Sequence, residues 1–525
     1  GRLNCRGHRR GPLHPGTYLM LWAFVASPAL SAHRPLRVSR HAPPRSQLSV
    51  SIFDLVAGQD DTRLADLPAL CQWVDDAGGD GLLAVEAEST PDHGLGLRTT
   101  QAVKRGDVLL SVPMTLALGA ESVLRSSIGQ WLVDFDPWLA DYAFVSVALI
   151  HERRLGEQSD LAPWLRSSLL PDRPDVPLLW SAEQQAELKG STTAPFESRL
   201  AEMRDDYAWL QENVFDAAPV VFPAVVFTWD AYVEAHAIAF SRCCILASKD
   251  AVRPALLPLL DLANHVAEPS ARIEVVEAKA GGRFGGKATA ASVDLVATAD
   301  MASGAEVCVR YGGETAGDLL VDYGFADSRA PPLASLEFEI DEEDPNYDDK
   351  CDVLENEAGL AVSQPWVLSA QQPEPSPELM AVLRLRHMDG SDAFLLEGIF
   401  RQVLWPEHLQ LPISRNNEEK AVRDAIDRCA AAVAGFSGSM QSDLGLLAEA
   451  EPGTSSYQLA TVRYAERRAL EASARWFEAA LERLGELEYY QERRLRNLGL
   501  EPIETAEELD ALRAENMRGG GEESG

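Results

Sequence analysis

Three short segments, far apart along the 525-residue chain, hold residue types that could bind a ligand and orient a reacting group. The first, residues 92–97, reads Asp-His-Gly-Leu-Gly-Leu. Its two glycines would let the backbone approach a ligand closely, because glycine has no side chain to hold the ligand away. Taken alone, the segment is more typical of a tight turn before a strand.

The second segment combines Ala-Phe-Ser-Arg at residues 239–242 with Leu-Leu-Pro-Leu-Leu-Asp-Leu-Ala-Asn-His at residues 256–265. The apolar run indicates a buried core, and Asn264 and His265 place hydrogen-bonding groups at its edge. By itself, His265 is also compatible with a core histidine or with one ligand of a metal site. No companion ligands occur at a suitable spacing, so we predict no metal.

The third segment holds two Tyr-Gly pairs, at Tyr311 and Tyr323, on either side of a short expected helix. Both phenols would lie at the ends of secondary-structure elements, where their side chains can point into one pocket. For each pair alone, an aromatic core residue beside a turn is the simpler interpretation.

Together and in this order, the three segments resemble the SET family of protein methyltransferases, in its Rubisco large-subunit methyltransferase-like branch. The resemblance spans residues 80–328 and implies S-adenosylmethionine as the cofactor. It implies that Arg242 pairs the cofactor's carboxylate, that Tyr311 is the catalytic tyrosine and that Tyr323 is the second catalytic candidate. The residues that it implies around the cofactor are His93, Gly94, Leu95, Ser241, Arg242, Asn264, His265, Tyr323 and Phe325.

The chemistry of methyl transfer suits these residue types. A methyl group on a positively charged sulfur needs only an unprotonated amine in line behind it, so positioning and desolvation should contribute more than covalent catalysis. A dry channel beside the sulfonium would lower the lysine pKa from its usual value of about 10.4. Tyr311 could then orient the amine without acting as a strong base.

The sequence therefore predicts a protein-lysine N-methyltransferase that acts on a non-histone protein, such as the Rubisco large subunit or another plastid enzyme. Histidine methylation by an enzyme of the same architecture is one alternative, although Leu260 and Cys244 offer no polar or indole group for an imidazole. A catalytically silent SET-fold module that binds a partner protein is the other. Residues 315–318, Thr-Ala-Gly-Asp, also depart from the Ser-Asn-Ala-Glu of the branch, so cofactor affinity or helix capping could suffer.

The elements expected around these segments form an α+β fold. We expect a SET domain over residues 54–328, with short β-sheets, a threaded crossing and a helical insertion over about 118–235. An all-α domain would follow over 329–515, and 516–525 would be a disordered tail. The resemblance of residues 463–470 to the same branch implies that this helical domain binds the substrate. The individual expected strands are 82–86, 96–102, 107–112, 271–278, 288–298, 305–311 and 335–340; the first three would form one small antiparallel sheet. The expected helices include 138–155, one capped by Ser181 and Gln184, 228–246 and long segments within 457–498, while 281–286 would be a hairpin tip and 341–349 an acidic loop.

The first 53 residues differ from the rest of the chain, because they contain eight arginines and no Asp, Glu or Lys. This composition predicts a targeting leader, a signal-like part followed by a transit-like part, and therefore a plastid location. The alternative is a disordered basic tail on a cytoplasmic protein.

The whole chain is strongly acidic, with 81 Asp and Glu against 47 Lys and Arg and a formal charge of -34. Such a field repels phosphate backbones, so we expect no nucleic-acid partner and rather a protein with a basic face. The seven cysteines include no CxxC pair, which argues against a zinc site. We also expect no stable membrane insertion, because no run of roughly 20 apolar residues occurs, and we expect a monomer.

Overall fold

The computed structural model describes residues 62–79, 84–90, 94–133, 140–194, 196–247, 252–278, 290–312, 315–400, 403–450 and 453–500. The expected leader, His93, the hairpin tip at 281–286 and the expected tail at 516–525 lie outside these residues. No described helix is both long enough and apolar enough to cross a bilayer.

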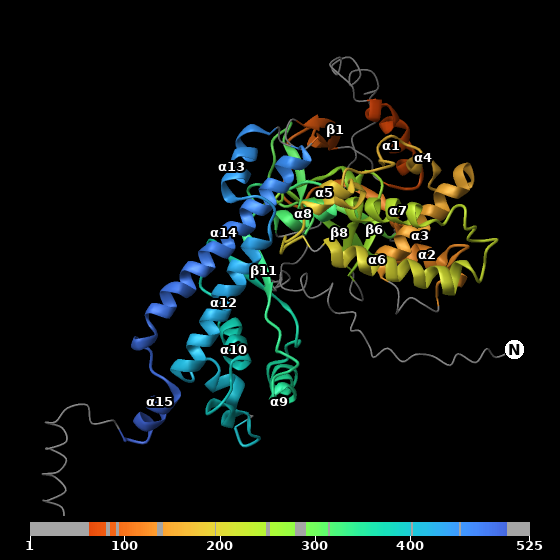
Figure 1. The fold of residues 1–525 in the computed structure, drawn as a ribbon. Helices are drawn as coiled ribbons and strands as arrows, with labels where there is room; N and C mark the ends of the chain where they lie inside the picture. Colours follow the sequence, from red (N-terminus) through yellow and green to blue (C-terminus); the bar gives the residue numbers. More distant parts are fainter. Residues whose placement is uncertain are drawn as a thin grey trace, which may run out of the picture.

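Among the described residues, strands between Val85 and Val309 form three small sheets, and short sheets in this part of the chain are what the sequence predicts (Figure 1). The first sheet has the order β1 (Val85–Thr90), β2 (Gly94–Thr99), β10 (Glu306–Val309) and β7 (Asn264–His265). Within this sheet, only the β10–β7 pair is parallel. The second sheet joins β3 (Val108–Pro113), β9 (Ser292–Ala297) and β8 (Ala271–Val276), and the third joins β4 (Leu118–Gly119), β6 (Val252–Leu256) and β5 (Cys244–Ala247). The expectation that β3 shares a sheet with β1 and β2 is wrong, because β3 pairs with the distant strand β9.

The helical insertion follows β4, as expected. It contains α2 (Ala120–Arg125), α3 (Asp141–Leu155), α4 (Ala162–Leu165), α5 (Ala182–Ala186), α6 (Phe196–Leu210) and α7 (Trp229–Arg242). The capping box predicted for Ser181 and Gln184 is present at the start of α5. The prediction that α7 continues to residue 246 is wrong: the helix ends at Arg242, because Cys244 to Ala247 pair with β6 instead.

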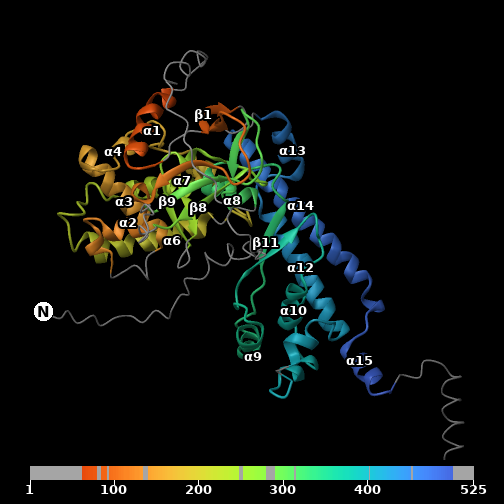
Figure 2. The same cartoon turned by 180° about the vertical axis from the view of Figure 1, so that it is seen from behind.

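The last third of the chain is mainly helical, which confirms the prediction. After the short helix α8 (Ala316–Tyr323) come α9 (Tyr347–Asp352), α10 (Pro377–Arg386), α12 (Arg415–Gly435), α13 (Met440–Glu449), α14 (Ser455–Glu482) and α15 (Tyr490–Asn497). A two-stranded sheet of β11 (Leu333–Glu337) and β12 (Pro365–Ser369) was not expected in full, since only its first strand was predicted. Helix α9 occupies part of the expected acidic loop. Both views show α14 running from beside α8 down along α12 (Figures 1 and 2).

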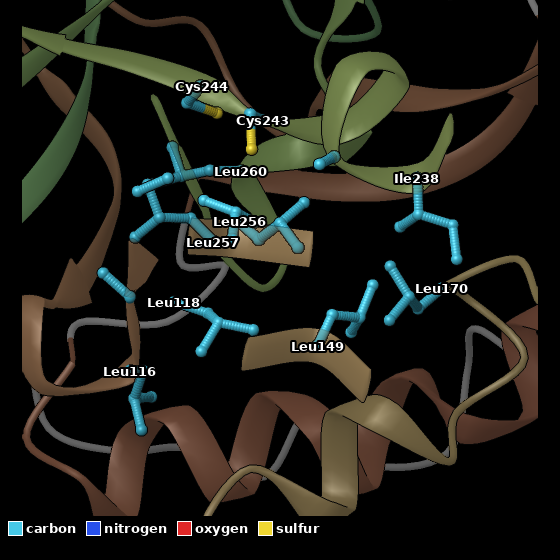
Figure 3. Packing of buried hydrophobic residues seen from close by; sticks show 14 of the residues in the cluster. Leu116, Leu118, Leu149, Leu170, Ile238, Cys243, Cys244, Leu256, Leu257 and Leu260 are labelled. Carbon is cyan, nitrogen blue, oxygen red and sulfur yellow. The ribbon is translucent and has the colours of Figure 1, made fainter. Parts of the chain in front are cut away.

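The apolar residues that the structure describes form two large clusters and one small one. The first cluster draws its members from residues 70–309 and the second from residues 334–477. The proposed domain boundary after residue 328 falls between them. Figure 3 shows part of the first cluster, in which Cys243, Cys244 and Leu260 pack among leucines of β4, α3 and β6. The apolar run at 256–262 therefore anchors the chain in the core directly before it enters β7.

Candidate active site

The chain enters the site through a strained turn. Leu259 has a φ of 66° and is the one non-glycine residue with positive φ among the described residues. It is buried and precedes the 3-10 turn Leu260–Leu262, after which the chain runs into β7. A left-handed conformation is unfavourable for leucine, so the buried apolar run must hold it in place. The turn sets the direction in which Asn264 and His265 leave the core.

Asn264 ties together three segments that are distant in sequence. Its backbone lies opposite Cys308 in the parallel β7–β10 pair. Its side-chain amide donates one hydrogen bond of 3.3 Å to the carbonyl oxygen of Leu95 in β2 and one of 3.1 Å to Oε1 of Glu306 in β10. The glycine-bearing strand and the Asn-His segment therefore meet, as the sequence predicts.

His265 and Tyr311 are joined by a direct hydrogen bond. The backbone N–H of Tyr311 donates to Nδ1 of His265 at 3.1 Å, so this nitrogen carries no proton. The Tyr311 hydroxyl donates to the carbonyl oxygen of Ala263 at 3.0 Å. The hydroxyl proton is thus used in the hydrogen bond to the backbone, and the lone pairs of the phenol oxygen can accept a hydrogen bond from another group.

Helix α8 brings the second phenol to the first. Tyr323 is its last residue, and Gly324, with a φ of 82°, ends the helix in a left-handed cap that only glycine adopts easily. The Tyr323 hydroxyl donates to the backbone carbonyl of Tyr311 at 3.1 Å, and the two ring centroids are 4.5 Å apart. The Phe325 ring lies 5.9 Å from that of His265. The two phenols therefore lie side by side. That they line a common pocket stays a prediction.

Both phenols are held in their neutral form. Burial raises the pKa of Tyr311 well above its usual range, an effect that the positive charge of Arg242 only partly opposes. Burial also raises the pKa of Tyr323. At neutral pH these side chains can position a group through hydrogen bonds, but they do not supply a phenolate base.

Arg242 occupies the last turn of α7. One of its Nη atoms donates to the backbone carbonyl of Asp261 at 3.3 Å and lies 4.0 Å from that residue's carboxylate. The Arg242 side chain is 25% exposed, whereas the Asp261 side chain is 3% exposed. Ser241 is placed differently, since its hydroxyl donates to Ile238 in its own helix at 3.4 Å.

Comparisons with known proteins place the chain in a family. Residues 341–470 match the model of the Rubisco LSMT substrate-binding family. The chloroplastic Rubisco large-subunit N-methyltransferase of Pisum sativum is 33% identical over 426 residues, which cover 78% of this chain and 82% of that protein. The chain belongs to the Rubisco large-subunit methyltransferase family.

Other relatives of this family are similar over most of the chain. The chloroplastic fructose-bisphosphate aldolase-lysine N-methyltransferase of Arabidopsis thaliana is 31% identical over 442 residues, covering 82% of this chain and 86% of that protein. The crystal structure of the SET domain of LSMT bound to lysine and AdoHcy has a TM-score of 0.74 and 28% identity, and covers 86% of this chain and 100% of that one. The human actin-histidine N-methyltransferase is more distant, at 24% identity over 81% of this chain and 69% of that protein.

The side chains at this site fit the cofactor of a family methyltransferase. S-adenosylmethionine carries a carboxylate, an ammonium group, a sulfonium and an adenine ring. Arg242 offers a partly exposed guanidinium for a carboxylate, and Asn264 with the nearby backbone carbonyls offers polar partners for an ammonium group. The rings of Tyr311, Tyr323 and Phe325 offer faces that favour a cation.

Two site residues were given no role from the sequence. Asp261 lies inside the predicted segment, and its position two residues before Ala263 gave no sign that it would face Arg242. Glu306, the partner of Asn264, is 42 residues away in sequence. The signal that could have indicated this role is the position of Glu306 at the start of the strand that precedes Tyr311.

The departure at residues 315–318 does not impair helix capping. Thr315 accepts a hydrogen bond of 2.9 Å from the backbone N–H of Asp318, and its own hydroxyl donates to the Asp318 carboxylate at 2.8 Å. This closed capping box replaces the expected defect, because a threonine followed three residues later by an aspartate satisfies the same backbone groups.

Proposed function

We propose that the chain transfers a methyl group from S-adenosylmethionine to a lysine side chain of a non-histone protein. The observation that carries this proposal is the Tyr311 hydroxyl, whose proton is donated to the Ala263 carbonyl and whose lone pairs remain available to accept a hydrogen bond. Such an oxygen accepts a hydrogen bond from an amine and turns the nitrogen lone pair away from itself. The family relatives named for lysine methylation support the same reaction.

Different residues bind the cofactor and orient the lysine amine. Arg242 pairs the carboxylate of the cofactor, and Asn264 and His265 hold its amino group and adenine edge. When bound, the cofactor supplies a methyl group on a positively charged sulfur. Tyr311 orients the lysine amine in line with that methyl group, while Tyr323 supports Tyr311 through its backbone carbonyl. The amine releases its proton to solvent before transfer, and the new bond between nitrogen and carbon forms as the bond between sulfur and carbon breaks.

Lysine is favoured over histidine by the apolar side chains beside the site. Leu260 is 1% exposed and Cys244 is 8% exposed, and neither provides a hydrogen-bonding group suited to an imidazole. Burial raises the pKa of Cys244 to about 12, so its thiol is neutral. An imidazole needs a polar partner for each nitrogen, and these two side chains supply none, whereas the relatives named for lysine methylation are also the more similar ones.

The chloroplastic relatives and the expected leader support a plastid substrate. The Rubisco large subunit and fructose-bisphosphate aldolase are the first candidates to assay, because those relatives are named for them. The formal charge of -34 would steer a substrate with a basic face toward this protein. We also propose that the protein is a monomer and has no nucleic-acid partner.

Labelled S-adenosylmethionine, a plastid extract and the protein together test the proposal. We expect one labelled band, and hydrolysis of that band should yield methylated lysine. Arg242→Ala serves as the control for background labelling. Methylated histidine would contradict the choice of lysine, and tight cofactor binding with no labelled protein would favour the catalytically silent binding module.

A further inference from the structure

The small third cluster of apolar residues lies where three parts of the chain meet. Its members come from the segment after α5 together with the first residue of α6, from α8 with the residue after Phe325, and from α14; they are Leu188, Ala194, Phe196, Ala316, Leu320, Val321, Ala326, Leu459 and Val462. Both ribbon views show the upper end of α14 beside α8 (Figures 1 and 2). The helix that ends in Tyr323 is therefore packed directly against the helical C-terminal region.

Within this contact, α14 buries a carboxylate that accepts five hydrogen bonds. Glu466 is 1% exposed. One of its oxygens accepts from the Ser191 hydroxyl at 2.6 Å, from the Thr193 N–H at 3.1 Å and from the Thr193 hydroxyl. The other accepts from the N–H and the hydroxyl of Thr192, at 2.7 and 3.2 Å. Because five donors from three consecutive residues converge on its two oxygens, Glu466 fixes the backbone of residues 191–193. Burial raises the pKa of this carboxyl, an effect that the hydrogen bonds from Ser191, Thr192 and Thr193 oppose.

The fixed segment in turn sets the position of the first turn of α8. A Cβ atom added to Gly317 would lie 2.2 Å from the Thr193 hydroxyl oxygen and 2.8 Å from its carbonyl carbon. Only a residue without a side chain allows this approach, which accounts for glycine at a position where the branch usually has alanine. The N-terminal turn of α8 thus rests on Thr193, the residue that Glu466 holds.

The other end of α8 is held by the same long helix. The backbone N–H of Ala326, the residue after Phe325, donates to the side-chain oxygen of Gln458 in α14. Gln458 is 7% exposed, so this hydrogen bond is shielded from water. Helix α14 therefore fixes α8 on both sides of the Tyr323-Gly-Phe325 segment.

We propose that Glu466 is a positioning residue for methyl transfer: through residues 191–193 it places α8, and with α8 the Tyr323 and Phe325 rings. This inference rests on the proposed function. It also gives the C-terminal region a role in the site itself, because Glu466 lies within residues 341–470, which match the substrate-binding family.

The size of the effect follows from the contacts of Tyr323. Its hydroxyl reaches the Tyr311 carbonyl at 3.1 Å and its ring lies 4.5 Å from the Tyr311 ring, so a small shift of α8 disturbs both phenols. A misplacement of about 1 Å in a catalytic arrangement can cost as much as about 100-fold in rate. Arg242, which would pair the cofactor's carboxylate, belongs to α7 and not to α8.

Glu466→Gln tests the proposal, because it keeps the shape but turns one carboxylate oxygen into an amide that faces hydrogen-bond donors. We expect kcat to fall by about 10-fold or more, with the KM of the protein substrate within about 3-fold of wild type. We also expect faster hydrogen exchange in peptides that cover residues 316–326. Glu478→Gln, at an exposed position of the same helix, is the matched control and should change none of these quantities.

A second pair of variants, at Thr193, keeps the test possible if Glu466→Gln fails to fold. Thr193→Val removes the hydroxyl that Glu466 accepts from, and Thr193→Ser keeps it, so the first should lower kcat and the second should restore it. A wild-type kcat and unchanged exchange over 316–326 in both Glu466→Gln and Thr193→Val would overturn the proposal. So would a fall in kcat that matches the unfolded fraction. If the wild-type protein transferred no methyl group, the exchange measurements would still decide whether Glu466 holds α8.

Discussion

Tyr311→Phe offers the most direct test of the proposed chemistry, because it removes one hydroxyl and leaves the ring. The hydroxyl donates to the Ala263 carbonyl at 3.0 Å, and Ala263 is 1% exposed. Leaving a buried carbonyl without its donor costs about 1–3 kcal/mol. For a domain of this size, that corresponds to a fall in Tm of roughly 2–4 °C per kcal/mol.

The loss of rate should exceed what the loss of stability explains. A hydroxyl that orients the amine only in the transition state contributes roughly 10²-fold or more to kcat. A 10²-fold loss corresponds to about 2.7 kcal/mol of activation free energy. The affinity for S-adenosylmethionine should stay near the wild-type value, because the phenol acts on the amine and the transferring methyl group rather than on the bound cofactor.

Tyr207→Phe is the matched control for the hydrogen bond. The Tyr207 hydroxyl donates to the backbone carbonyl of Phe227 at 2.9 Å, within the helical insertion. The two variants should lose similar stability, measured by thermal unfolding, while only Tyr311→Phe should lose turnover, measured with labelled cofactor and the identified substrate. A Tyr311→Phe enzyme with wild-type kcat would refute the assignment and make Tyr323 the first candidate.

Two further predictions concern a charge and a buried imidazole. Arg242→Ala should weaken S-adenosylmethionine binding about 10-fold or more in calorimetry, with Arg242→Lys losing less; unchanged affinity for both would remove Arg242 from the site. Burial and the nearby charge of Arg199 lower the pKa of His236 to about 3, so this imidazole is neutral in the folded protein and takes up a proton on unfolding below its usual pKa of about 6.5. Its contribution to stability is therefore complete above pH 6.5 and declines as the pH falls toward 3, by about 2 kcal/mol at pH 5. The Tm of His236→Gln should fall less than that of wild type between pH 7 and pH 5, and parallel curves would exclude His236 as a cause.

The sequence predicts those parts of the molecule that depend on local patterns. Alternating and periodic apolar residues gave the strands around the site and the helical C-terminal region, and Ser181 with Gln184 gave a helix start that the structure confirms. The resemblance of the ordered motifs to the SET family predicts that Asn264, His265, Tyr311 and Tyr323 belong to one site. The strands, the helices and this helix start are set by residues that lie within one element, whereas the shared site is implied by the family resemblance.

Features that depend on pairing between distant segments were not predicted. Strand β3 pairs with β9, which lies about 180 residues later in the sequence. Asn264 can donate to Glu306 because β7 and β10 pair in parallel. Helix α7 ends at Arg242 for the same kind of reason, since the residues after it pair with β6. Local secondary-structure propensity cannot predict which strands pair, because the free energy of pairing comes largely from side-chain contacts with the partner strand.

Residues 315–318 show why a departure from a family pattern has to be judged in three dimensions. Read along the chain, the missing asparagine and the glycine in place of alanine look like losses at the start of α8. In the structure, Thr315 and Asp318 close a capping box, and Gly317 makes room for Thr193, which Glu466 holds from α14. The glycine costs helix propensity, about 1 kcal/mol relative to alanine, but it permits a contact that alanine would prevent. The departure therefore places α8 directly against Thr193, so the effect of replacing Gly317 has to be measured together with variants of Thr193 and Glu466.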